Sequence, residues 1–130
     1  MFRIEPLSRK PVYEQLVEQT ETLVLNGGLH AGDQMPSVRT LAVTLSINPN
    51  TIQKAYLELD RRGILQAAPG KGNFIAPEAR ERLCRQKRTE LGAFDALARE
   101  LMLAGVKPDD LRARIQTLAE TTLKGEATDD

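Results

Sequence analysis

Two short amphipathic patterns, separated by a brief break, lie between Ser37 and Gly63 and restrict the fold more than any other stretch. In the first pattern, apolar residues recur at the spacing of one helix face, at Val38, Leu41, Ala42 and Leu45. In the second pattern the same spacing returns, at Ile52, Ala55, Tyr56 and Leu59. Two short helices joined by a tight turn form a helix-turn-helix, and we predict that motif here.

The residues at the ends of the two patterns are typical helix start and stop signals. Ser37 is a good N-cap for the first helix. Asn48 can cap the second helix, with Pro49 at the first helical position, where the missing N–H group has no cost. Gly63 is a typical residue to follow the end of the second helix.

The outward face of the second helix is polar in an unusual way. Its first turns carry Asn50, Thr51, Gln53 and Lys54 rather than alternating Glu and Lys. Asn and Gln can form two hydrogen bonds with adenine, Thr can contact a thymine methyl group, and Lys neutralises phosphate. The N-terminal residues of the second helix are those that reach base edges in a helix-turn-helix, so we predict DNA recognition. An ordinary solvated face is the alternative interpretation.

A β-hairpin is predicted directly after this helix. Residues 64–66 and 73–75 form two short apolar segments around a tip rich in Gly and Pro. In this position a hairpin acts as a wing. Gly70 and Gly72 allow close approach to a DNA backbone, and Lys71 places a cation at the tip. The sequence Gly-Lys-Gly is not a nucleotide-binding loop, because the rest of the Walker pattern is absent.

Further helical patterns flank this region. We expect a strand-like start over 1–4, a helix over 11–26, a long helix over 77–104 and a last helix over 108–125. Residues 126–130 are expected to form an acidic disordered tail. The fold class is therefore mainly α with a small β-hairpin: a winged helix-turn-helix over residues 1–76, followed by a two-helix region over 77–125.

The two C-terminal helices carry apolar stripes that they cannot cover by themselves. The residues expected to form the covered surface are Leu91, Phe94, Leu97, Leu101, Leu111, Ile115 and Leu118. We favour pairing with a second copy of the chain in a four-helix arrangement, and docking onto residues 1–76 is the alternative. A twofold dimer would present two recognition helices to the halves of a palindromic site.

The charge balance does not by itself indicate DNA binding. The chain has 18 Lys and Arg residues against 18 Asp and Glu residues, so its formal net charge is zero. Residues 1–76 contain eight cationic and seven anionic side chains. Any affinity for DNA must therefore come from the positions of the cations and from two linked copies of the site. A winged helix that binds another protein is the main competing function.

Other functional classes have little support. The single cysteine, Cys84, excludes an intramolecular disulfide and a multi-cysteine metal site, although the cations around it at positions 82, 85 and 87 leave a redox role open. The sequence has no nucleophile motif and no cluster of His, Cys and carboxylate residues, so we expect no enzyme activity, metal or cofactor. It also has no apolar run of membrane-spanning length and no signal peptide, which predicts a cytoplasmic protein without membrane contact. Tyr13 is interpreted as a core residue, with a phosphate contact as the alternative.

Four segments resemble the GntR family of bacterial transcriptional regulators, and within it the short YtrA-like subfamily. They are PVYEQLVEQ at 11–19, LHAGDQMPSVRTLA at 29–42, NPNTIQKAYLELDRRGIL at 48–65 and GKGNFIA at 70–76. The resemblance implies a winged-helix repressor that binds an operator as a homodimer and often controls genes of an ABC-type transporter. A small-molecule effector of unknown identity is a further expectation.

The DNA-binding residues expected from the motifs and the resemblance are Ser37, Arg39, Asn48, Asn50, Thr51, Gln53, Lys54, Gly70, Lys71 and Gly72. Two departures from the family pattern matter. Ser46 stands where the family usually has Gly, and a left-handed conformation there would cost about 1 kcal/mol. Ala68 and Pro69 replace an Arg-rich approach to the tip of the wing.

Overall fold

The structure, a computed structural model, describes the backbone of residues 1–128 and the side chains of residues 1–122. In chain order its elements are α1 (Val12–Asn26), α2 (Val38–Leu45), α3 (Pro49–Arg61), β1 (Leu65–Ala68), β2 (Gly72–Ile75), α4 (Ala79–Arg88), α5 (Leu91–Leu103) and α6 (Pro108–Thr128). The chain divides after Cys84 into two compact units. The predicted fold class, mainly α with a small β-hairpin, is confirmed.

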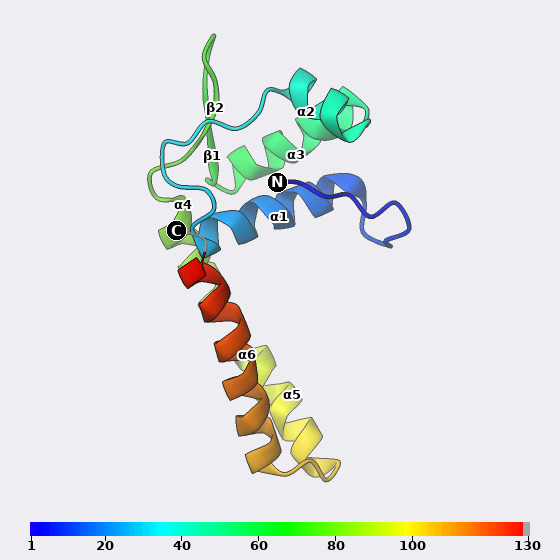
Figure 1. Cartoon of the computed structure of the whole chain (residues 1–130), viewed down its shortest axis with the longest axis vertical. Helices are drawn as coiled ribbons and strands as arrows, with labels where there is room; N and C mark the ends of the chain where they lie inside the picture. Colours follow the sequence, from blue (N-terminus) through cyan, green and yellow to red (C-terminus); the bar gives the residue numbers. More distant parts are fainter. Residues whose placement is uncertain (129–130) are drawn as a thin grey trace. The chain divides into compact units, whose positions relative to one another are not determined.

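The core of the first unit forms around one side of α3. Ile52, Ala55 and Leu59 are completely buried there. α3 packs against α1, α2 and β1, which surround it in the ribbon view (Figure 1). Each buried Leu or Ile side chain stabilises the fold by roughly 1.5–3 kcal/mol relative to an exposed one, so this core fixes the position of the opposite, polar side of α3.

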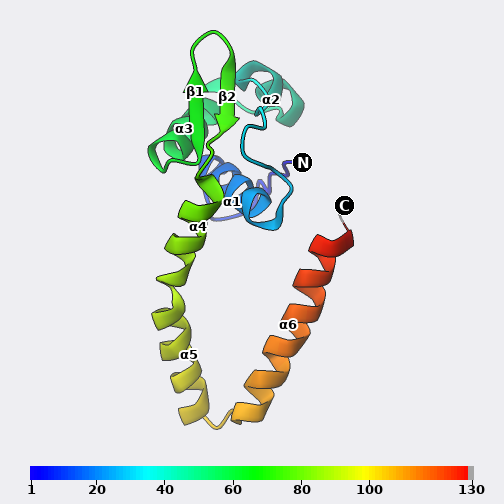
Figure 2. The same ribbon diagram turned by 90° about the vertical axis from the view of Figure 1, so that its left-hand side faces the viewer.

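The hairpin that follows α3 is antiparallel. Leu65 pairs with Ile75 at its base, and Ala68 pairs with Gly72 next to the tip. A short segment before α2 lies along the free edge of β2, since the N–H group of Met35 donates to the carbonyl oxygen of Asn73 at 2.8 Å. An isolated antiparallel bridge between Gln34 and Phe74 therefore flanks the two-stranded hairpin on one side, and the tip of the hairpin points away from α1 (Figure 2).

The strand-like start predicted for residues 1–4 is not formed. Instead, two side-chain amides of α1 bind the backbone of the N-terminal segment. The Gln19 Oε1 atom accepts a hydrogen bond from the N–H group of Arg3 at 2.8 Å. The Gln15 Oε1 atom accepts one from the N–H group of Glu5 at 2.9 Å. Because Gln15 and Gln19 are one helical turn apart, they satisfy alternate residues of an extended segment without a strand partner.

The long helix predicted over residues 77–104 is interrupted. α4 ends at Arg88 and α5 begins at Leu91. The N–H groups of Thr89 and Glu90 bond to carbonyl oxygens three residues earlier rather than four. The Thr89 hydroxyl also donates to the carbonyl oxygen of Gln86 at 2.6 Å, which offers this backbone an alternative to the helical bond. The helix is therefore interrupted by local hydrogen bonds at Thr89 and Glu90, which the spacing of apolar residues does not indicate.

The boundaries of the two units also differ from the predicted domain limits. The first unit continues past Ala76 to Cys84, because Ala79 and Leu83 on α4 are buried in its core. In the second unit, α5 is followed by a turn in which Gly105 has a φ of 99°. α6 extends to Thr128, into the segment predicted as a disordered tail, and the last two residues of that segment lie outside the described residues.

Candidate nucleic-acid interface

One side of α3 is buried and the other faces outward at its N-terminal end. The side chains of Asn50, Gln53 and Lys54 are exposed, and Thr51 is half-buried. The structure therefore brings together on one short surface four of the side chains predicted to contact DNA. Amides at two of these positions can pair with base edges, as direct readout in the major groove requires.

Two of the predicted DNA-binding residues have structural roles as helix caps. The Ser37 Oγ atom accepts a hydrogen bond from the N–H group of Thr40 at 3.0 Å, and its hydroxyl donates to the Thr40 Oγ1 atom at 2.8 Å. The Asn48 Oδ1 atom accepts from the N–H group of Asn50 at 2.8 Å. Both caps were predicted from the sequence. They leave the side-chain amide group of Asn48, and not the Ser37 hydroxyl, with hydrogen-bond donors for a ligand.

Arg39 on α2 and Lys71 at the tip of the wing, both predicted to contact DNA, are exposed cations. Neither side chain forms a hydrogen bond or an ion pair in the part of the chain that the structure describes. Gly70 and Gly72 adopt φ values of 77° and 117°, so the tip needs glycine at both positions. The Gln34 Nε2 atom donates to the carbonyl oxygen of Lys71 at 2.9 Å, which ties the tip to the segment before α2.

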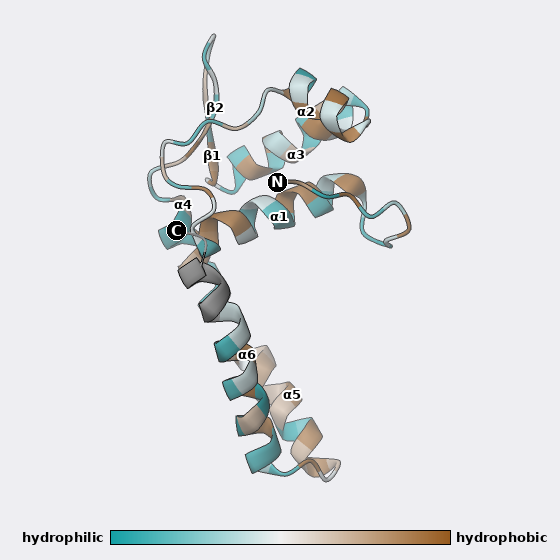
Figure 3. Ribbon diagram, in the orientation of Figure 1, coloured by the Kyte–Doolittle hydropathy of each residue, from teal (hydrophilic) through white to brown (hydrophobic). Residues whose placement is uncertain are grey.

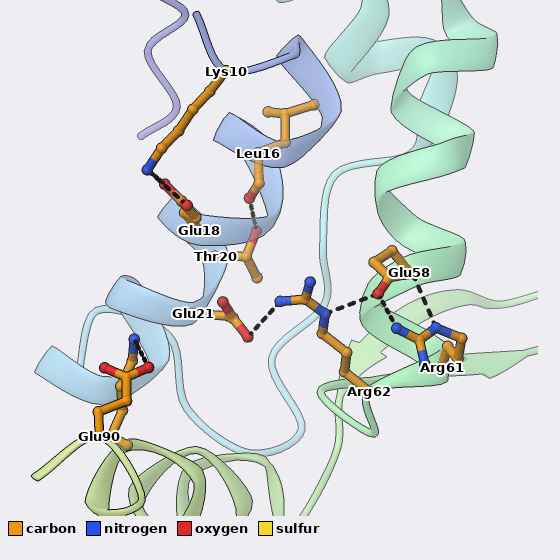
Figure 4. A network of polar contacts seen from close by, with 10 residues as sticks. Lys10, Leu16, Glu18, Thr20, Glu21, Glu58, Arg61, Arg62 and Glu90 are labelled. Atoms are coloured by element: carbon orange, nitrogen blue, oxygen red, sulfur yellow. Dashed lines mark hydrogen bonds and ion pairs between the residues drawn. The ribbon is translucent and has the colours of Figure 1, made fainter. Parts of the chain in front are cut away.

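The cations at the other end of α3 are neutralised (Figure 4). The carboxylate of Glu58 accepts hydrogen bonds from the Nε atoms of Arg61 and Arg62, each at 3.0 Å. Arg62 also donates to Glu21 on α1 at 3.2 Å. The hydrogen bonds from Arg61 and then from Arg62 lower the pKa of Glu58 from 4.5 to about 2. Within the helix-turn-helix and the wing, the cations without a carboxylate partner among the described residues are therefore Arg39, Lys54 and Lys71.

The turn between α2 and α3 contains a strained residue. Ser46 has φ 55° and ψ 48°, the left-handed conformation that glycine adopts without steric cost. Its N–H group is satisfied by the end of α2, where it bonds to the carbonyl oxygens of Ala42 and Val43. The sequence identified the position correctly, and the structure shows that the serine does adopt the costly conformation.

The environment of Lys54 is a feature that sequence reasoning missed. Its Nζ atom lies 3.9 Å from the centroid of the Tyr13 ring, on α1. Tyr13 is half-buried and packs against the core, as predicted, but it also presents a ring face to this cation. The two residues are far apart in the sequence, so no local pattern signals their contact.

The second unit carries the apolar surface predicted for dimerisation. Of the seven predicted residues, all except Leu111 are exposed, and Leu111 is half-buried. Phe94 is 52% exposed and Ile115 is 50% exposed. Figure 3 shows hydrophobic residues along α5, none of which is buried. These side chains have no covering partner within the described part of this unit.

Two other classes of feature are absent from the described residues. No group of three or more His, Cys, Asp or Glu side chains there could hold a metal ion. None of the helices in this part of the chain is both long enough and apolar enough to cross a membrane. Cys84 is a free, half-buried thiol on α4.

The chain is similar to a family of bacterial regulatory proteins, to a transcriptional repressor and to solved structures of transcriptional regulators. The family described as bacterial regulatory proteins, gntR family, matches residues 12–75. The HTH-type transcriptional repressor YtrA of Bacillus subtilis (strain 168) is 36% identical over 130 residues, which cover 99% of this chain and 100% of YtrA. A transcriptional regulator from Oenococcus oeni superimposes with a TM-score of 0.71 at 32% identity, covering 91% of this chain and 98% of that one.

A further match is a DNA complex. The structure of AraR(DBD) in complex with operator ORX1 has a TM-score of 0.51 at 28% identity and covers 58% of this chain and 93% of that one. The YtrA protein is named as a transcriptional repressor, and the protein from Oenococcus oeni is named as a transcriptional regulator. The match to YtrA spans both proteins from end to end, and the winged helix-turn-helix carries the family pattern. The chain therefore belongs to the GntR family of DNA-binding transcriptional regulators.

Proposed function

We propose that the protein is a repressor that binds a palindromic operator as a homodimer. The observation that carries this proposal is the exposed polar surface at the N-terminal end of α3, opposite a completely buried apolar side. A winged helix that binds protein would be expected to expose apolar or acidic side chains there. The end-to-end similarity to a protein named as a transcriptional repressor supports the direction of the regulatory effect.

In the proposed complex, α3 enters the major groove with its N-terminal end. Asn50 and Gln53 are exposed and can pair with base edges. Arg39, at the start of α2, takes a guanine or a phosphate. The wing then lies over the minor groove or the adjacent backbone, where Lys71 is the cation of its tip and the glycines on either side permit close approach.

Residues 1–76 would bind DNA, and the helices after them would hold the dimer together. The apolar residues of α5 and α6 are exposed in the single chain, and a second copy can cover them in a four-helix arrangement. Linking two half-site interactions raises the overall affinity through effective concentration. This offsets the zero net charge of the chain, which gives little general attraction to DNA.

The genes under control are proposed to include a transporter operon, as the YtrA-like resemblance implies. A small-molecule effector is proposed to bind at the dimer interface or between the C-terminal helices, where α5 and α6 expose apolar side chains. Release of the operator would follow if the effector favoured a dimer with a different spacing of the two α3 helices.

The test is binding to DNA from the region upstream of the protein's own gene, titrated across salt beside an unrelated fragment of equal length. Specific regulators bind their sites roughly 10³-fold or more tightly than other DNA, and we expect that ratio with two protomers per site. A footprint should show two inverted half-sites about one helical turn apart. Equal binding to both fragments, with and without metabolites from a cell extract, would overturn the proposal and favour a protein-binding winged helix.

A further inference from the structure

The contact between Lys54 and Tyr13 joins the recognition helix to α1. The Lys54 Nζ atom lies 3.9 Å from the centre of the Tyr13 ring, within the range of a cation–π interaction. Lys54 is exposed, whereas Tyr13 is half-buried and anchored against the core. The Tyr13 hydroxyl has only a long contact, 3.4 Å, with the Glu14 carboxylate. The ring face, rather than the hydroxyl, is therefore the group that holds the ammonium group.

No carboxylate among the described residues forms an ion pair with Lys54. A lysine on a helix surface is normally within reach of residues three or four positions away, and Glu58 lies four positions after Lys54. The Glu58 carboxylate is instead occupied by Arg61 and Arg62. Lys54 forms no ion pair within the described residues, in contrast to Lys10, whose Nζ atom lies 2.8 Å from Glu18.

The geometry points to a phosphate-binding pair in which Tyr13 is a positioning residue and Lys54 is the group that contacts DNA. This inference rests on the proposed function. An aromatic face attracts a cation without neutralising it, so the ammonium group keeps its charge and its remaining N–H donors for a phosphate oxygen. Holding Lys54 toward α1 assigns it to the DNA backbone rather than to a base edge.

The consequence concerns how α3 is oriented in the groove. Phosphate contacts fix the register and orientation of a protein on the duplex, whereas base contacts supply sequence specificity. A lysine fixed against α1 gives a phosphate contact at a defined position beside the base-reading residues Asn50 and Gln53. Lys54 therefore contributes to affinity for operator and unrelated DNA alike, and removing it leaves the ratio of the two affinities unchanged.

The test compares the wild type with Tyr13→Phe, Tyr13→Leu, Lys54→Ala and the Tyr13→Leu/Lys54→Ala double variant on operator and unrelated DNA across salt. Removing one neutralised phosphate reduces the slope of log K against log salt by about 0.9, so Lys54→Ala should reduce it by about 1.8 per dimer. Tyr13→Leu should weaken binding roughly two- to fivefold for each protomer, whereas Tyr13→Phe, which keeps the ring, should bind like the wild type. The double variant should bind no more weakly than Lys54→Ala.

Lys107→Ala is the matched control, because it removes the same charge from the turn before α6 and should leave the slope unchanged. A second measurement tests the pair without DNA. The ε-methylene protons of Lys54 should show a ring-current shift in the wild type and in Tyr13→Phe that is abolished in Tyr13→Leu. The rest of the same spectrum shows whether Tyr13→Leu is folded around a normal core.

Three results would overturn the inference: additive losses in the double variant, equal weakening by Tyr13→Phe and Tyr13→Leu, or a base-specific effect of Lys54→Ala. Failure of the proposed function gives a different result, namely a wild type with no preference for the operator. In that case the salt slope on unrelated DNA still tests whether Lys54 contacts phosphate. A wild type that binds no DNA at all would overturn both.

Discussion

The phenolic hydroxyl of Tyr56 donates a 2.6 Å hydrogen bond to the carbonyl oxygen of Pro36. Tyr56 lies on the buried side of α3, and Pro36 immediately precedes the N-cap of α2. The bond therefore ties the recognition helix to the start of the other helix of the helix-turn-helix. Pro36 is half-buried, so water has limited access to its carbonyl group. Without the Tyr56 hydroxyl, this carbonyl group would lack a hydrogen-bond donor.

We predict that Tyr56→Phe lowers the free energy of unfolding by about 1 kcal/mol, since it removes this hydrogen bond but keeps the ring in the core. Urea unfolding measures the loss. The Tyr13→Phe substitution is the control: it removes a hydroxyl that has only a long contact, so it should change stability by much less.

Burial raises the pKa of Tyr56 from 10.0 to about 12. The folded state therefore favours the neutral phenol over the phenolate. The resulting stabilisation should be fully present below pH 10 and lost as the pH rises toward 12. The Tyr56→Phe variant, which has no phenol, should not show this loss.

Ser46→Gly should stabilise the protein. Ser46 holds a left-handed backbone, which costs a residue with a Cβ atom about 1 kcal/mol relative to glycine. Part of that gain is offset by the greater freedom of glycine in the unfolded chain. A net increase of several tenths of a kcal/mol in urea unfolding is expected. Ser46→Ala keeps the Cβ atom and should give no increase, so equal effects of the two substitutions would contradict the assignment.

Glu58 should make the stability of the protein sensitive to acid. Its pKa is lowered in the folded state to about 2 from 4.5, so the network with Arg61 and Arg62 stabilises the fold fully above pH 4.5 and is lost as the pH falls toward 2. The Glu58→Gln variant lacks this contribution. The difference in free energy of unfolding between wild type and variant should therefore shrink between pH 4.5 and 2. A difference that is constant over this range would show that the charge of Glu58 is unimportant.

Substitutions at the proposed interface should separate base contacts from phosphate contacts. Arg39→Ala and Gln53→Ala should each cost roughly 1–3 kcal/mol at particular base pairs and relax the preference there. Lys71→Ala should weaken binding to all sequences and reduce the salt slope by about one unit for each phosphate that it no longer neutralises. Titrations against a set of operator variants measure both effects. Equal losses on every sequence from all three substitutions would rule out the proposed roles.

Charged substitutions on α5 and α6 should test the proposed dimer. An aspartate at Leu101 or at Ile115 would place a charge in the apolar surface that a second copy would cover, so Leu101→Asp and Ile115→Asp should give monomers with weakened operator binding. Sedimentation gives the oligomeric state. Leu7→Asp, at a residue that is 99% exposed in the N-terminal segment, should leave it unchanged. Persistence of dimers in both α5 and α6 variants would place the dimer interface elsewhere.

Much of the first unit could be predicted from the sequence, because its signals are local. The apolar spacing at Ile52, Ala55 and Leu59 predicted the buried side of α3, and those residues are fully buried. Ser37 and Asn48 were predicted as caps and form cap hydrogen bonds. Each of these signals depends on residues within one or two helical turns, where backbone geometry alone decides which groups meet.

Two of the predicted elements are wrong because local features of the sequence compete with the apolar pattern. The apolar spacing over 77–104 favoured one helix, yet the Thr89 hydroxyl and the shortened backbone bonds at Thr89 and Glu90 divide it. Similarly, the apolar character of residues 1–4 suggested a strand, although strands need partners. The amides of Gln15 and Gln19 supply those bonds instead.

The sequence by itself determined the order and the polarity of the elements: a helix-turn-helix with a polar outward face, a glycine-rich hairpin tip and two helices with uncovered apolar stripes. Only the tertiary structure decided which distant side chains meet. The packing of α1 against α3 brings the Tyr13 ring into contact with Lys54 and the Glu21 carboxylate into contact with Arg62. The two residues of each pair are 41 positions apart in the sequence. The physical reason is that local periodicity fixes which face of a helix is buried, whereas the contacts between helices depend on how those faces are packed together.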